Sequence, residues 1–190
     1  PPSLNLSNEI GILTGSGGSG AFSKFHIGPD RNLYMTNGND IARITSVAGT
    51  SGNSATYLTF DSDVITRGLD DDGIHLIIVG DNKAQAPILA KRGRYRCFVA
   101  FWNMKSQDLT RIWEFQDNAV YGVAAVEDEV LVFGAHNIYT CSVGSRPRVL
   151  YSLIGNSNLP TEATTITSPL PYAIVKKDNG TILWADGTSL

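Results

Sequence analysis

The sequence predicts an all-β fold assembled from repeated four-stranded units, and three observations support this. The chain of 190 residues has 19 Gly, 2 Met, 42% apolar and 17% charged residues, which is typical of a globular protein with many turns and few helices. Short apolar runs alternate with turns rich in Gly, Asn and Asp. One strand–turn–strand pattern recurs along the chain.

The pattern appears first in residues 30–44, "DRNLYMTNGNDIARI". Residues 33–36 form a β-prone apolar run, and residues 41–44 resume the apolar rhythm. Residues 37–40 are typical of a turn, because Gly and Asn accept the positive φ that a tight hairpin needs. This stretch therefore predicts a β-hairpin.

Similar apolar runs, each flanked by Asp, Asn or Gly, begin at Leu33, Leu76, Val130 and Ile182, with spacings of 43, 54 and 52 residues. A period of roughly 40–55 residues with several short strands per copy is typical of propeller blades. One further strand candidate precedes each of these runs, and two follow each of the first three. The sequence thus predicts a β-propeller of four-stranded antiparallel blades, with about four blade units visible.

The predicted units are residues 22–60, 64–115, 120–153 and 164–190, preceded in residues 1–21 by N-terminal strands at 3–6 and 10–14 and a Gly/Ser-rich linker. The N-terminal strands could complete the fourth blade and close a ring. Alternatively, the chain is a segment of a larger ring, which we favour because both ends look cut. Residues 106–115 fit a capped helix as well as a strand, and the repeat favours the strand.

The apolar runs also predict a core. Strands buried on both faces read as nearly continuous apolar runs, so we expect five buried side chains: Leu76, Ile78, Leu131, Phe133 and Leu183. Cys97 and Cys141 lie in strand-like runs and are interpreted as buried free thiols rather than a disulfide. Packing between blades is the favoured role of Trp102, Trp113 and Trp184 over stacking on a sugar or partner.

The sequence contains only weak matches to motifs that bind cofactors or metal ions. The run "GSGGSG" at residues 15–20 matches a dinucleotide fingerprint, but no room follows for the helix that would hold the pyrophosphate, so a linker is favoured. Asp61, Asp63, Asp70, Asp71 and Asp72 could hold a hard cation such as Ca²⁺. Their spacing does not match the twelve-residue calcium loop, so solvated turns are favoured and cation binding stays open.

Three histidines, His26, His75 and His136, lie far apart and in no zinc-binding motif, and no Gly-x-Ser-x-Gly elbow is present. The expectation is therefore no catalytic residue, no cofactor and no bound metal. A net charge of −3 argues against a dedicated nucleic-acid binder. Apolar runs are too short for a membrane span.

Three stretches carry a family resemblance: "NLYMTNGNDIARI", "CFVAFWNM" and "AVYGVAAVEDEVLVFGAHNIY". In this order they resemble the β-propeller domains of tailed-bacteriophage structural proteins, over most of residues 22–153. The resemblance implies a tail or fibre component located in the virion. It transfers no catalytic residue. With no signal peptide visible, an extracellular or cytoplasmic location is the alternative.

Three functions follow as hypotheses. The favoured one is a non-catalytic structural or adhesion module of a larger assembly, compatible with a homo-oligomer. A glycan-binding, lectin-like propeller is the alternative, and a polysaccharide-degrading enzyme is less favoured because no pair of acids is marked by a motif.

Loops are expected to carry the contacts, because propeller strands are committed to blade packing. The long loops are residues 48–55, 80–94 and 155–165. The second holds the one basic cluster of an acidic chain, and these candidate contacts to a structural protein or a cell-surface glycan are Lys83, Lys91, Arg92 and Arg94. A solvated loop is the competing interpretation.

Overall fold

The computed structural model describes residues 24–45, 53–82, 95–117 and 119–152, together with the backbone of residues 173–176 and 182–185. Every regular element in these residues is a β-strand. The predicted all-β class is therefore confirmed. In the described part of the chain, no helix is long and apolar enough to cross a membrane.

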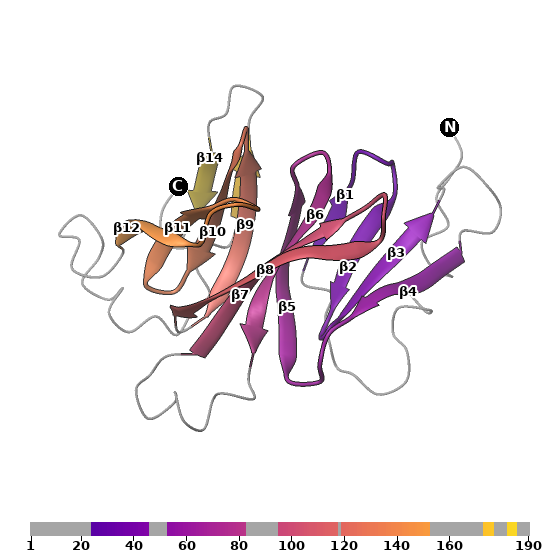
Figure 1. Ribbon diagram of the computed structural model, residues 1–190, viewed down its shortest axis with the longest axis horizontal. Coiled ribbons are helices and arrows are strands. Elements are labelled where there is room, and N and C mark those ends of the chain that lie inside the picture. The colour runs from indigo at the N-terminus through magenta and orange to yellow at the C-terminus, as the bar shows by residue number, and fades with distance from the viewer. Residues whose placement is uncertain are drawn as a thin grey trace.

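The strands form three four-stranded antiparallel sheets and one strand pair, each ordered as in the chain (Figure 1). The first sheet contains β1 (Phe25–Ile27), β2 (Leu33–Asn37), β3 (Asp40–Thr45) and β4 (Asn53–Thr59). The second contains β5 (Val64–Asp71), β6 (His75–Asn82), β7 (Tyr95–Asn103) and β8 (Asp108–Asp117). The third contains β9 (Val120–Val126), β10 (Glu129–Gly134), β11 (Asn137–Cys141) and β12 (Arg148–Ser152). The pair is β13 (Ala173–Lys176) with β14 (Ile182–Ala185).

The first strand of each sheet lies against the first strand of the next. Strand β1 contacts β5, β5 contacts β9, and β9 contacts β13. The sheets follow one another across the molecule, from β1–β4 through β5–β8 to β9–β12 (Figure 1). The described strands do not form a closed ring.

Two local predictions about turns and strands are confirmed. The hairpin between β2 and β3 turns at Gly38 and Asn39, with Gly38 at a φ of +62°, a conformation that costs glycine no steric strain. The segment with the helix-like start is strand β8, which pairs with β7 from Asn103–Asp108 to Tyr95–Asp117. Its polar start belongs to the β7–β8 turn, where Gln107 has a positive φ.

Hydrophobic packing occurs on both faces of the second sheet. Leu76 and Ile78 pack with Tyr34 and other residues of the first sheet. Alternate residues of the same strand, Ile77 and Val79, face the third sheet. Successive side chains of a strand point to opposite faces, so β6 is buried on both faces, which explains its continuous apolar run.

Most predicted core residues are confirmed, with one correction. Leu76 and Ile78 are fully buried, and Phe133 is buried. Leu131 is only partly buried, so its prediction was wrong. It lies on the face of β10 opposite to Val130 and Val132, which pack toward the second sheet. The Leu183 side chain lies outside the described residues.

Cysteine and tryptophan roles agree with the sequence analysis. Cys97 and Cys141 are buried free thiols. The Trp102 indole Nε1 donates to the hydroxyl of Tyr57 in the first sheet, and Trp113 Nε1 donates to the carbonyl of Ser142 beyond β11. Both tryptophans therefore pack between sheets. The Trp184 side chain lies outside the described residues.

The predicted contact loops are only partly described. Strand β4 already begins at Asn53 and β6 continues to Asn82, so the first two loops are shorter than expected at those ends. Lys83, Lys91, Arg92, Arg94 and residues 155–165 lie outside the described residues, as do the N-terminal strands and the glycine-rich run.

Candidate functional site

The five clustered aspartates lie partly in turns and partly in strand β5. Asp61 and Asp63 are exposed in the turn between β4 and β5, as the solvated-turn interpretation predicts. Asp72 lies in the turn between β5 and β6, where its side chain is 23% exposed and hydrogen-bonded to His75. Asp70 and Asp71 instead belong to strand β5 and are partly buried. The interpretation was wrong for these two, because β5 lies between β1 and β9 and its end is covered by them.

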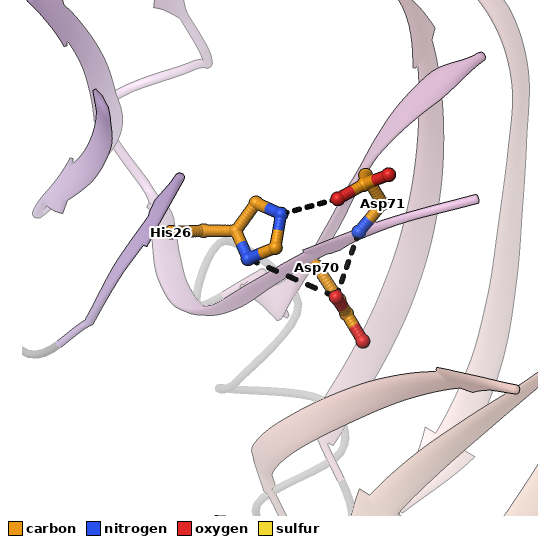
Figure 2. A group of neighbouring side chains, drawn as sticks. All are labelled: His26, Asp70 and Asp71. Atoms are coloured by element: carbon orange, nitrogen blue, oxygen red, sulfur yellow. Dashed lines mark hydrogen bonds and ion pairs between the residues drawn. The ribbon is translucent and has the colours of Figure 1, made fainter. Parts of the chain in front are cut away.

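Strand β1 brings His26 to Asp70 and Asp71 (Figure 2). The ring nitrogen Nε2 lies 2.5 Å from Asp71 Oδ2, and Nδ1 lies 3.7 Å from Asp70 Oδ1. The imidazole thus has one carboxylate at each ring nitrogen. The three side chains are only 14–20% exposed. Their potential ligand atoms lie within 4.8 Å of one another.

Backbone hydrogen bonds fix both carboxylates. Asp70 Oδ2 accepts from the Ala125 N–H of β9 at 2.6 Å, and Asp70 Oδ1 accepts from the Asp71 N–H at 2.9 Å. Asp71 Oδ1 accepts from the Gly73 N–H at 2.8 Å, where Gly73 has a φ of +86°. Each carboxylate therefore keeps one oxygen directed at His26.

A cavity of about 260 Å³ adjoins this group, where β1, β5 and β9 meet. Its polar side chains are Lys24, His26 and Asp70. Glycine at positions 68 and 122 allows β5 and β9 to approach closely beside the cavity, since a Cβ on Gly68 would come within 3.1 Å of the Gly122 Cα. The full lining is Lys24, Phe25, His26, Gly68, Leu69, Asp70, Gly122, Val123 and Ala124.

The cavity can recognise polar ligands. Lys24 offers hydrogen-bond donors and a positive charge, Asp70 offers acceptors, and His26 can do either according to its protonation. Phe25, which also lines the cavity, is apolar and 72% exposed. A site with both charges and an aromatic neighbour suits a hydroxyl-bearing ligand or a cation held by His26 and Asp70.

The other two histidines have structural surroundings. His75 Nδ1 lies 2.9 Å from Asp72 Oδ2 within one turn. Burial alone would raise the pKa of Asp72, but hydrogen bonds from His75 and from the Ile74 N–H outweigh it, so the pKa is held below its ordinary value. His136 Nδ1 lies 3.3 Å from the fully buried carboxylate of Asp117.

Two buried carboxylates that the sequence analysis did not single out bind neighbouring segments. Asp81 accepts from the Val120 N–H of the third sheet and from Arg67 Nε. Burial raises the pKa of Asp81 above its ordinary value, and the hydrogen bond from Val120 and the Arg67 charge oppose this shift. Asp117 accepts from the Tyr139 hydroxyl at 2.9 Å. Both side chains stabilise contacts with the third sheet.

Sequence reasoning missed the grouping of His26 with the aspartates. His26 and Asp71 are 45 positions apart and belong to different repeat units, so no local spacing marks them. One signal was present: His26 lies in the first strand of one predicted unit, and Asp70 and Asp71 follow the first strand of the next. If first strands of neighbouring units lie side by side, these residues can meet.

Comparisons with known proteins place the fold among solved structures but show no family. No protein-family model matches the chain, and no curated protein matches it. The chain is similar to the extracellular domain of BT4673 from B. thetaiotaomicron, which is described as a one-component system, with a TM-score of 0.55 and 11% identity. The match covers 89% of this chain and 20% of that one. At this identity the likeness concerns the fold alone.

Proposed function

We propose that the chain forms part of a β-propeller and acts as a non-catalytic structural or adhesion module of a larger assembly. In a propeller, four-stranded antiparallel blades surround an axis, and the first strands of successive blades are neighbours around it. The contacts of β1 with β5, of β5 with β9 and of β9 with β13 follow this order, which supports the proposal.

The use of polar side chains supports a structural role. The Thr66 N–H and hydroxyl both donate to the Gly38 carbonyl, which joins the second sheet to the first. Asp81 and Asp70 accept from backbone N–H groups of the third sheet. Buried polar groups are stabilising only when paired, and here the pairing fixes one sheet on the next.

Exposed apolar side chains support the proposal that the chain belongs to a larger assembly. In the first strand of the first sheet, Phe25 is 72% and Ile27 is 67% exposed. In the last strand of the third sheet, Val149, Leu150 and Tyr151 are 45–57% exposed. Grouped apolar side chains of this size favour burial against another protein surface. The partners would be further sheets or other structural proteins.

A virion tail or fibre is the assembly we propose, on the strength of the motif resemblance in residues 22–153. A glycan-binding module is the second candidate. The cavity with Lys24, His26 and Asp70 beside the exposed Phe25 favours it, because sugars bind through hydroxyl hydrogen bonds and aromatic stacking. An extracellular position, as described for the similar domain of BT4673, would suit this second candidate.

The experiment combines localisation with binding. Antibodies against the purified chain should label tail structures of the parent particle in electron micrographs, and the chain should bind particle proteins in cross-linking experiments. Phe25→Ser with Ile27→Ser should weaken these cross-links, whereas an exposed polar change, Asp63→Ser, should not. Binding to a glycan array without particle labelling would favour the second candidate. Turnover of a polysaccharide would contradict both.

A further inference from the structure

We propose that His26 and Asp70 bind a divalent first-row metal ion of the Zn²⁺ class at the edge of the cavity, and that Asp71 orients the histidine. The proposal goes beyond the structural role and does not depend on it. It rests on three features: the placement of the two ring nitrogens, the fixed carboxylates and the adjoining space.

The two sides of the imidazole differ. Nε2 lies at hydrogen-bond distance from Asp71, whereas the 3.7 Å between Nδ1 and Asp70 Oδ1 is too long for a hydrogen bond. When Nε2–H donates to Asp71, Nδ1 carries a lone pair that faces a carboxylate. Two electron-rich atoms in this position are stabilised by a shared cation. For Zn²⁺ bonds of about 2.0–2.1 Å, two ligands of a tetrahedral ion lie about 3.4 Å apart.

Asp71 is placed like the carboxylate that orients a metal-binding histidine in many proteins. Histidine ligands of metals usually donate their second ring N–H to a carboxylate, which fixes the tautomer and the ring orientation. Asp71 is itself held by the Gly73 N–H. Asp70 is held by Ala125 and Asp71 while its Oδ1 still faces Nδ1. The two carboxylates therefore have different roles: Asp70 is a ligand and Asp71 a positioning residue.

The cavity supplies the remaining coordination positions. His26 and Asp70 line it and Asp71 does not, so an ion between Nδ1 and Oδ1 would face this space. About 260 Å³ holds several water molecules. One imidazole nitrogen with carboxylate oxygen favours Zn²⁺ or a similar ion over Ca²⁺ and Mg²⁺, which prefer oxygen ligands alone. Lys24 on the same cavity weakens cation binding by repulsion.

The test is calorimetric titration of the chelator-treated protein with Zn²⁺ at neutral pH, with Ca²⁺ as the comparison. Wild type should bind one Zn²⁺ more tightly than Ca²⁺. His26→Ala and Asp70→Asn should each lower the affinity at least about 10-fold, and Asp71→Asn about 10- to 100-fold. The matched control His136→Ala, which alters a histidine 3.3 Å from the buried carboxylate of Asp117, should bind as wild type. Lys24→Met should bind Zn²⁺ as tightly or more tightly, whereas an anion site would lose affinity.

A second measurement uses the wild-type protein alone, so it does not depend on whether the variants fold. In ¹⁵N-histidine spectra of the wild-type protein, Zn²⁺ should shift Nδ1 of His26 while Nε2 stays protonated. Absence of Zn²⁺ binding at millimolar concentration would overturn the proposal, as would equal affinity in a folded His26→Ala protein. Metallation of Nε2 would overturn the assigned role of Asp71.

Discussion

The indole Nε1 of Trp102 donates a 2.9 Å hydrogen bond to the hydroxyl of Tyr57, and the two rings meet edge to face with centroids 5.9 Å apart. This contact joins β7 of the second sheet to β4 of the first. Such pairs combine ring packing with a hydrogen bond, so they stabilise the junction in two ways.

Trp102→Phe and Tyr57→Phe should show coupled effects on stability. Each change removes one partner of the hydrogen bond and retains an aromatic ring. In a double-mutant cycle the coupling free energy should be about 0.5–1.5 kcal/mol, the usual net value of a hydrogen bond. Chemical denaturation of the four proteins gives this value. Strict additivity would mean that the two side chains do not meet.

Gly80→Ala should destabilise the second sheet strongly. A Cβ at this position would lie 2.3 Å from the Ile65 carbonyl oxygen and 2.9 Å from the Phe98 ring, so backbone or ring must shift. Overpacking of this kind costs about 1–3 kcal/mol. The control is Gly144→Ala, whose Cβ meets no atom within 4 Å and should stay within about 0.5 kcal/mol of wild type. Thermal unfolding compares the two, and equal melting temperatures would contradict the packing of β6 against β5.

Truncating a leucine should cost more stability in the centre of the second sheet than on the partly exposed face of the third sheet. Leu76→Ala removes a fully buried side chain and should cost about 2–5 kcal/mol. Leu131→Ala should cost less, because that side chain is only partly buried. Urea denaturation midpoints give the comparison. A larger loss at Leu131 would contradict the assignment of its strand face.

Acid should weaken the wild-type protein partly through Asp72. Its pKa is lowered in the folded state because the hydrogen bonds from His75 and Ile74 outweigh burial. A carboxyl with a lowered folded pKa contributes stability above its unfolded pKa, and this contribution is lost as the pH falls through the folded pKa. Asp72→Asn cannot titrate, so its unfolding free energy should change less than that of wild type between about pH 5 and pH 1. Asp61→Asn is the charge-matched control, and an unaltered acid dependence in Asp72→Asn would contradict the prediction.

Both thiols should be unreactive in the folded protein. Burial, with a smaller effect of the nearby Glu129 charge, raises the pKa of Cys141 to about 12. Burial and the charges of Asp81 and Asp117 raise the pKa of Cys97 still further. Because thiolate is the nucleophile, a disulfide reagent should label neither residue at neutral pH and both after denaturation. Rapid labelling of the native chain would contradict the burial of these strands.

The sequence predicted the repeat and its strands because turns and strands depend on residues that are close together in the chain. Gly38 permits the positive φ of the first hairpin, and the apolar run of β6 marks a strand buried on both faces. For residues 106–115, local pattern left helix and strand equally open, and the repeat decided correctly. The face of Leu131 was not readable, since alternation gives two faces and only the packed neighbour decides which one is buried.

The candidate site depended on tertiary structure. Sequence alone determined an all-β chain of four-stranded units, the buried cysteines and the packing roles of Trp102 and Trp113. Only the packing of β1 against β5, and of β5 against β9, brought His26 to Asp70 and Asp71 and opened the cavity beside Gly68. These residues come from different repeat units, and the physical reason is that strand pairing is local in the chain whereas sheet stacking joins residues that no sequence spacing connects.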